Sequence, residues 1–552
     1  MILQKLVNNK FIISLIISIQ LNSCITKTKV DLIVHNANIY TINSNNDIYE
    51  SVAVKDGEII DLGKNNQILN KYKADQTLDI AGKYIYPGFI DAHCHFLNYG
   101  LQQEMVNLSS ANSLKEIITL LKNHYSQNKE QWLVGYGWDQ NKWDNKTWPN
   151  NSLLNENFKN TNVVIRRIDG HALIANEKAI YSSKINLDTI IDKGHIEIIN
   201  NKPTGIFIDN AMNLILSKIP KPNEISKKTA LLKSQKECFS FGLTTVDIAG
   251  LNKSDIELID RLQSTEELKI KVYAMLSDNE ENLSYYLDTI GTPIKKNRLN
   301  IRSFKFFADG SLGSRGACMI KPYKDKITTN GFMLQKINIY EEKLDRLKKN
   351  GFQACTHAIG DSANRTILNS YSKVLKESND LRWRIEHAQC VSTDDINKFR
   401  QYNIIPSVQP THATSDFSWA ILRLGKKRLI ECYQYYSLFK QNQLIALGTD
   451  FPVEEINPIN TFYAAVFRKN SSGKPIEGFQ KDQALTRLEA IKGMTIWAAL
   501  SNFEENEKGS LEIGKSADLV VLNKDLFTER ESEILKTKVL KTIVNGEIVY
   551  SY

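Results

Sequence analysis

Residues that can hold a metal ion follow short apolar runs at widely separated points of the chain. They are His93, His95, Lys305, His357, His387 and Asp450. The runs are residues 84–90, 301–307, 352–356, 383–386 and 444–449. Each leads into a polar or glycine-containing turn, which predicts a strand. Ligands so far apart in sequence converge when parallel strands close into a (β/α)8 barrel, in which functional groups gather at the C-terminal strand ends.

The length of the chain requires more than a bare barrel, because 552 residues exceed the roughly 250 of a typical TIM barrel. Further strands are predicted at residues 163–168, 244–248, 269–276 and 404–408. Helical patterns alternate with the strands, as an α/β fold with a parallel barrel demands. The candidate strands number one more than eight. One early strand therefore belongs to an insertion, which we place as a cap over residues 100–240.

The two ends of the chain resemble each other in pattern. Residues 30–83 and 505–552 read as short strands divided by turns such as Asn545-Gly546. Neither segment has enough alternating apolar residues to be stable alone. We expect them to combine into one small β-sandwich domain beside the barrel, which then spans residues 84–504.

The first 23 residues have the features of a secretory signal. Lys5 and Lys10 precede the apolar residues 11–19, and Leu21-Asn-Ser-Cys24 follows. This pattern predicts a signal peptide, and its end resembles a bacterial lipobox with Cys24 as the lipidated residue. Residues 24–29 then form a tether to the membrane, and an exported lipoprotein on the periplasmic side of the outer membrane is expected. A plain signal peptide and an uncleaved anchor helix are the alternatives.

The amino-acid composition limits the classes of partner that this chain is expected to bind. The formal net charge of +8 is small for this length, and acidic and basic residues alternate, so nucleic-acid binding is not expected. A small-molecule substrate, a membrane reached through the lipid anchor alone and a homodimer are the partners that this interpretation allows. The six cysteines beyond Cys24 are interpreted as buried free thiols, although an exported protein permits disulfides.

His93 and His95 are two residues apart, so both side chains point to the same side of a strand. Two imidazoles at one strand end are a natural first half of a zinc site. A lone His-x-His pair is weak evidence, and two hydrogen-bonded core histidines are the alternative. Matching candidates at four other strand ends strengthen the metal interpretation.

The motifs PGFIDAHCH (87–95), FKFFADGSL (304–312), THAIGD (356–361), EHAQ (386–389) and GTD (448–450) resemble the amidohydrolase superfamily. More narrowly, they resemble the branch that contains N-substituted formamide deformylase. The resemblance implies a first metal on His93, His95 and Asp450 and a second on His357 and His387. It also implies that Lys305, carboxylated on its amine, bridges them. Histidine and carboxylate ligands suit zinc, one or two per chain, although iron, manganese and nickel accept similar sets.

Lys305 must lose its charge to serve as a ligand. Burial beside positive charge lowers the pKa of a lysine, and the neutral amine can react with carbon dioxide to form an anionic carbamate. The alternative is a lysine that pairs with Asp309 or Asp450 beside a single metal.

Three further residues are candidates for substrate binding. His171, in a segment similar to the same branch, could contact the substrate carbonyl or only fix Asp169. Trp138 could wall a pocket or pack with Trp143 inside the cap. Arg315 lies in the glycine-rich segment 310–316 and could meet an anionic group.

The expected function is hydrolysis of a C–N amide-type bond, in an N-substituted formamide or N-acyl compound, by metal-activated water. Asp450 would accept the proton of the water and pass it to the leaving nitrogen. A deaminase or cyclic-amide hydrolase would use the same ligands. A lipoprotein that binds a solute without chemistry is the non-enzymatic alternative.

Overall fold

The computed structural model describes residues 27–127, 131–185 and 194–552. The predicted signal peptide, Cys24 and the start of the tether lie outside these ranges. The first strand, β1 (Thr28–His35), already includes the last two residues predicted as tether. In the described ranges, every helix is too short or too polar to cross a membrane.

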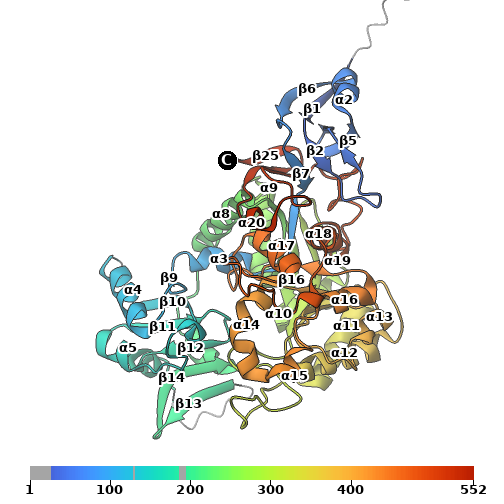
Figure 1. Cartoon of the computed structure of the whole chain (residues 1–552). Helices are drawn as coiled ribbons and strands as arrows, with labels where there is room; N and C mark the ends of the chain where they lie inside the picture. Colours follow the sequence, from blue (N-terminus) through green and yellow to red (C-terminus); the bar gives the residue numbers. More distant parts are fainter. Residues whose placement is uncertain (1–26, 128–130, 186–193) are drawn as a thin grey trace, which may run out of the picture.

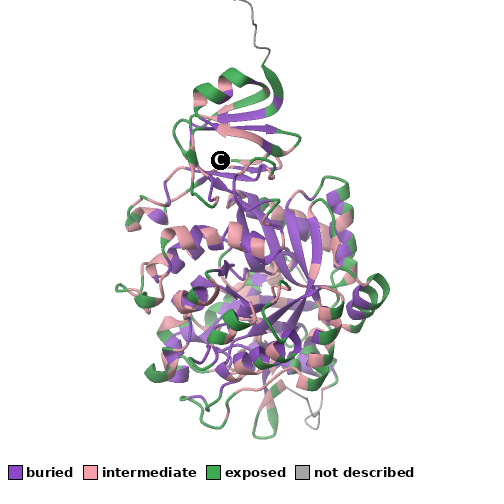
Figure 2. Ribbon diagram, turned by 90° about the vertical axis from the view of Figure 1, so that its right-hand side faces the viewer, coloured by how far each residue is buried: buried purple, intermediate pink, exposed green. Residues whose placement is uncertain are grey.

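Eight parallel strands form the predicted barrel, which confirms the fold class (Figure 1). In spatial order they are β8 (Phe89–Cys94), β15 (Leu243–Leu251), β16 (Lys271–Ser277), β18 (Leu299–Phe307), β19 (Gln353–Ala358), β20 (Arg384–His387), β21 (Ile405–Val408) and β22 (Ala446–Leu447). The ends of this row meet after β22, where the Asp450 N–H donates to the His93 carbonyl at 2.8 Å. Figure 2 shows buried residues running through these strands and exposed residues on the helices around them.

Helices cover the outside of the barrel. They include α3 (Phe96–Gln102), α8 (Glu224–Ser240), α9 (Lys253–Ser264), α11 (Ile337–Lys349), α12 (Asp361–Leu375), α13 (Asn397–Gln401), α14 (Pro410–Leu424), α16 (Tyr435–Asn442), α17 (Pro458–Phe467), α18 (Arg487–Gly493) and α19 (Ile496–Ser501). Residues 487–501 form two helices, α18 and α19. The chain breaks at Met494, whose carbonyl accepts the N–H of Ile90 in β8.

The cap is a six-stranded sheet, in the order β13-β14-β12-β11-β10-β9. Its strands are β9 (Val106–Asn107), β10 (Trp132–Trp138), β11 (Asn162–Arg167), β12 (Ala172–Ala175), β13 (Gly194–Ile199) and β14 (Lys202–Asp209), with helices α4 (Leu114–Gln127), α5 (Ser152–Asn157) and α6 (Glu177–Ser182). The extra candidate strand is therefore β11. The insertion ends before residue 224 rather than near 240, because Leu231, Cys238 and Phe239 of α8 pack into the barrel core.

Both chain ends build the small β-sandwich, as expected (Figure 1). One sheet has the order β5-β4-β1-β6 and the other β25-β24-β23-β7-β2-β3. The strands are β2 (Asn38–Tyr40), β3 (Ile48–Tyr49), β4 (Ser51–Lys55), β5 (Glu58–Gly63), β6 (Tyr72–Asp79), β7 (Tyr84–Pro87), β23 (Leu519–Leu522), β24 (Val539–Val544) and β25 (Glu547–Ser551). Val34, Val54, Ile85 and Val521 are part of the apolar cluster between the sheets.

The run 84–90, predicted as one barrel strand, is split between the two domains at Gly88. β7 pairs with β2 and β23 of the sandwich, whereas β8 pairs with β15 of the barrel. A Cβ at Gly88 would lie 2.3 Å from the Thr244 side chain. The chain can therefore pass from one sheet to the other here only with glycine.

The cysteine interpretation is correct for four of the six residues. Cys94, Cys238, Cys318 and Cys355 are buried and free. Cys390 and Cys432 form a disulfide, which corrects the interpretation of these two as thiols. The backbone brings them together as an isolated antiparallel bridge, 42 residues apart in sequence.

Candidate metal centre

His93, His95 and Asp450 form a compact group at the C-terminal end of the barrel. One nitrogen of each histidine and one carboxylate oxygen lie within 4.8 Å of one another. Asp450 Oδ1 is 3.2 Å from His95 Nε2 and 3.7 Å from His93 Nε2. This buried oxygen has no hydrogen-bond partner in the described part of the chain. Two imidazoles beside an unpartnered carboxylate oxygen suit a divalent metal, so the residues present fit a metal ion.

A second group shares Asp450. His387 at the end of β20 and His412 in α14 each offer a nitrogen within 4.8 Å of the other and of an Asp450 oxygen. His412 Nε2 is 3.2 Å from Asp450 Oδ2, and its Nδ1 is 3.0 Å from Glu454. The rings of His357 and His387 meet edge to face, with centroids 4.5 Å apart. Burial lowers the pKa of His357 and His387 well below the usual value, so both rings are neutral, as metal ligands must be.

A buried carboxylate orients His93. Glu386 Oε2 lies 2.5 Å from His93 Nδ1, and Glu386 Oε1 accepts the Arg384 Nε–H at 2.7 Å. Burial raises the pKa of Glu386, but the charges of Arg384 and His93 outweigh it and hold that pKa well below its ordinary value. Burial and the nearby Lys305 lower the pKa of His93 to about 4. Because His93 Nδ1–H donates a hydrogen bond to Glu386, the lone pair on His93 Nε2 can bind a metal.

Lys305 lies inside the barrel, where it is 1% exposed. Its Nζ is 3.1 Å from His93 Nε2 and lies over the Phe307 ring at 4.8 Å from the centroid. Burial lowers the pKa of its ammonium group, which favours the neutral amine. Asp309, one of its alternative partners, instead accepts backbone N–H groups such as that of Ile359 at 3.0 Å. Asp309 thus organises the loop after β19.

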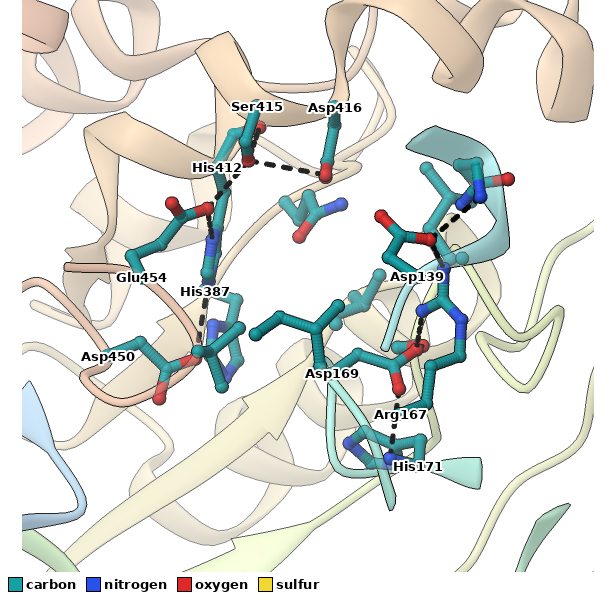
Figure 3. A pocket seen from close by; sticks show the side chains of 18 of the residues that line it. Asp139, Arg167, Asp169, His171, His387, His412, Ser415, Asp416, Asp450 and Glu454 are labelled. Carbon is teal, nitrogen blue, oxygen red and sulfur yellow. Dashed lines mark hydrogen bonds and ion pairs between the residues drawn. The ribbon is translucent and has the colours of Figure 1, made fainter. Parts of the chain in front are cut away.

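A pocket of about 230 Å³ separates the metal residues from the cap (Figure 3). The barrel side is lined by Lys305, His357, His387, His412 and Asp450. The cap side is lined by Asp139, Arg167, Asp169 and His171. Figure 3 shows the labelled side chains of the two sides facing each other across the space. A small molecule in this pocket would touch both the metal residues and the cap.

His171 comes from the cap and reaches the barrel side. Its ring centroid is 5.3 Å from that of His357, and its Nδ1 is 2.7 Å from Asp209 Oδ1. Burial opposes protonation of His171, but the hydrogen bond to Asp209 outweighs it and raises the pKa of the ring. The other ring nitrogen, Nε2, is left to meet a substrate.

The glycine-rich segment 310–316 accommodates Asp209. A Cβ at Gly310 would lie 2.8 Å from the Asp209 carboxylate, and a Cβ at Gly316 would lie 2.5 Å from it. A Cβ at Gly313 would similarly approach Arg167 to 2.9 Å. Glycine therefore lets the cap seat two charged side chains against the loop that follows Lys305.

Two predicted substrate-binding residues lie elsewhere. Trp138 is fully buried in the cap core, where its indole N–H donates to the Ile165 carbonyl at 3.0 Å. Arg315 pairs with Asp325 at 3.0 Å. Neither residue lines the pocket. Trp138 lies beside Trp143 inside the cap, with ring centroids 6.2 Å apart, which confirms the alternative given for it, and the expectation for Arg315 is wrong. Spacing along the chain could not show which face of the cap sheet or which side of the loop meets the barrel.

Other site residues carried weak sequence signals or none. His412 follows a predicted strand end in the segment Gln409-Pro-Thr-His, which was a weak signal for it. Glu386 immediately precedes His387, and its carboxylate lies 2.5 Å from His93 Nδ1. The φ of His387 is +71°, so the strand alternation that would send the two side chains to opposite faces is broken here and both lie beside the metal residues. Asp209 carried no sequence signal, because its role depends on the cap folding onto the barrel.

Comparisons with known proteins agree with this geometry. The model of the amidohydrolase family matches residues 76–550. This chain belongs to the amidohydrolase family. YtcJ of Bacillus subtilis is 29% identical over 526 residues, which cover 94% of this chain and 98% of that protein. N-substituted formamide deformylase of Arthrobacter pascens is 26% identical over 542 residues, covering 94% of this chain and 98% of the enzyme.

A solved structure supports the same assignment. An uncharacterized metal-dependent hydrolase from Pyrococcus horikoshii OT3 superposes with a TM-score of 0.74 at 27% identity, covering 91% of this chain and 99% of that one. The resemblance inferred from the motifs is therefore confirmed at the level of family and fold. This amidohydrolase carries histidine and aspartate groups with the spacing of a metal site.

Proposed function

We propose that this amidohydrolase cleaves a C–N amide-type bond in an N-substituted formamide or another N-acyl compound. The observation that carries the proposal is the group of His93, His95 and Asp450 facing the cap residue His171 across one pocket. The similarity to N-substituted formamide deformylase along nearly the whole chain supports this substrate class.

The side chains divide the chemistry among them. A divalent metal on these ligands supplies Lewis acidity and lowers the pKa of water to about 7. Burial opposes ionisation of Asp450, but its contacts with His412 and His95 outweigh this and hold its pKa well below the usual range. The ionised carboxylate can accept a proton from water and return it to the leaving nitrogen. His171, held by Asp209, is placed to donate a hydrogen bond to the substrate carbonyl.

Zinc is the proposed metal, with one or two ions per chain. For two ions, we propose that Lys305 is carboxylated and bridges them, which its burial and lowered pKa support. His357 and His387 would hold the second ion, and His412 is close enough to join them.

The test is a hydrolysis screen with zinc-loaded enzyme on N-formyl, N-acyl and cyclic amides, with amine, acid and ammonia measured separately. We expect formate or another acid together with a primary amine. His93→Ala should lose both metal and turnover while keeping the fold, because Glu386, the buried partner of His93, keeps its ion pair with Arg384 at 2.7 Å. His195→Ala, an exposed histidine of the cap, is the matched control. Ammonia as the product would assign a deaminase instead, and full turnover in His93→Ala would refute the proposal.

We also propose that the mature protein is a lipoprotein of the cell envelope. The support is the signal-like start of the chain with Cys24 at its end. Several acyl chains on one cysteine hold a protein stably at a membrane, whereas a single chain is marginal.

A further inference from the structure

A second cavity adjoins the metal centre between the cap and helix α3. Its volume is about 250 Å³, enough for a small organic group. Residues that line both this cavity and the first include His95, Asp169, His171 and Phe307. These shared residues mark the junction of the cavities, so a molecule held at the metal centre can extend into either one.

The second cavity is lined by an arginine, Arg166, that forms no ion pair with the described residues. Arg166 in β11 lines it, and the buried Arg166 Nε has no hydrogen-bond partner among the described residues. The neighbouring Arg167 differs, because it is held by Asp139 and Asp169 at 2.6 and 2.5 Å. Burial lowers the pKa of Arg166. A buried guanidinium nitrogen without a partner is costly, and Arg166 as a whole is half-buried, so its guanidinium is open to an anion in the cavity.

Neutral polar groups surround this arginine. Tyr136 is the register partner of Arg166 on the adjacent strand β10, so the two side chains leave the same face of the cap sheet. Asn98 and Gln102 are four residues apart in α3, which places them on one side of that helix. All four residues line the cavity. A hydroxyl and two amides can complete the hydrogen bonds of a carboxylate that meets the arginine.

The second cavity has a basic lining. The first is lined by the carboxylates Asp139, Asp169, Asp416, Asp450 and Glu454, and also by the basic residues Lys142, Arg167 and Lys305. In the second, the acid among the lining residues is Asp169, which Arg167 neutralises. Arg166 therefore leaves an excess positive charge that attracts an anionic group to the second cavity. This attraction orients a substrate about the metal centre.

We propose that Arg166 binds a carboxylate of the substrate, so that the preferred substrates are amides with a carboxylate near the scissile bond, such as N-formyl or N-acyl amino acids. The proposal rests on the amide hydrolysis proposed above and narrows its substrate class. The carboxylate lies in the second cavity, and the scissile amide lies at the junction beside His95 and His171.

The test compares N-formylphenylalanine, as both enantiomers, with N-(2-phenylethyl)formamide, which lacks only the carboxylate. Zinc-loaded wild-type enzyme should show a lower KM for one enantiomer of the acid than for the neutral compound. Arg166→Ala should raise that KM at least about 30-fold, because a charge-paired group loses its partner. It should leave turnover of the neutral compound unchanged, which also shows that the variant is folded. Arg166→Lys should recover part of the effect, since it keeps the charge without the planar fork.

The matched control is Arg298→Ala, which removes an arginine paired with Glu266 outside both cavities. Hydrolysis of the neutral formamide with no preference for the acid would overturn the carboxylate site and leave the amide hydrolase standing. If neither formamide is cleaved, the proposed function fails, and calorimetric binding of N-acetylphenylalanine decides the site. Binding to wild type but not to Arg166→Ala supports the site. Equal binding, no binding, or binding of inorganic phosphate alone overturns it.

Discussion

Replacing Glu386 by Gln should weaken metal binding without unfolding the protein. The Glu386 carboxylate accepts a hydrogen bond from His93, with Oε2 2.5 Å from Nδ1, and neutral glutamine is a weaker acceptor. Loss of such a partner of a metal-ligating histidine typically costs 10–100-fold in metal affinity. This range corresponds to about 1.4–2.8 kcal/mol. The effect reaches the metal only through the orientation and basicity of His93.

The fold should survive because Arg384 keeps other partners. Its guanidinium also pairs with Asp247 at 2.9 Å and donates to Ser407 at 2.9 Å. The loss of stability should therefore stay below the roughly 3–5 kcal/mol of an uncompensated buried charge. Alanine at position 386 would remove the acceptor as well and is expected to cost more.

The assay is competition for zinc with a chromophoric chelator, with thermal unfolding measured on the same samples. Glu505→Gln is the control, because it also neutralises a glutamate paired with arginine, Arg382, at 2.9 Å. The control should keep wild-type zinc affinity. A Glu386→Gln variant that is folded and binds zinc within twofold of wild type would refute the role of this carboxylate.

Further predictions concern a bridge, an anchor and an ion pair. Lys305→Ala should lose most activity and one of two metals. Formate should partly restore the activity of this variant, whereas Lys305→Arg should stay inactive. One metal per wild-type chain, together with full activity in Lys305→Ala, would contradict the bridge. Cys24→Ser should move the protein from the membrane to the soluble fraction at unchanged specific activity, and continued attachment would indicate another anchor. Burial opposes ionisation of Glu504, but Lys508 and Lys295 lower its pKa, so its stabilisation is complete above about pH 4.3 and is lost as the pH falls further. Glu504→Gln should therefore lower stability by about 3 kcal/mol at pH 7 and much less at pH 3, and an equal loss at both pH values in thermal unfolding would refute this.

Local pattern was enough to predict the barrel and most of the candidate metal ligands that the structure brings together. His93 and His95 are two residues apart, so both side chains point to the same side of an extended chain. This periodicity does not depend on the position of the strand in the fold. The apolar runs before His357, His387 and Asp450 mark strand ends in the same way. These signals are contained within a few residues, and the structure brings all of these side chains to one end of the barrel.

Features that depend on two distant segments were predicted poorly. Residues 84–90 divide at Gly88, where the Thr244 side chain leaves no room for a Cβ. Thr244 is more than 150 residues away in the sequence, so a local pattern cannot show this contact. The disulfide requires Cys390 and Cys432 to meet, and thiol spacing alone does not determine a pairing. The sequence left Trp138 between a pocket wall and the cap core, and only the structure places it in the cap core.

The sequence by itself determined the class of fold, most of the candidate metal ligands and their placement at strand ends, because strand periodicity and turn chemistry are local. The tertiary structure alone decided that His412 lies beside the candidate ligands, that Asp209 holds His171 and that Arg166 forms no ion pair with the described residues. Each of these depends on the cap or a helix packing against the barrel. Such packing results from many long-range contacts whose combined free energy is not visible in any short segment.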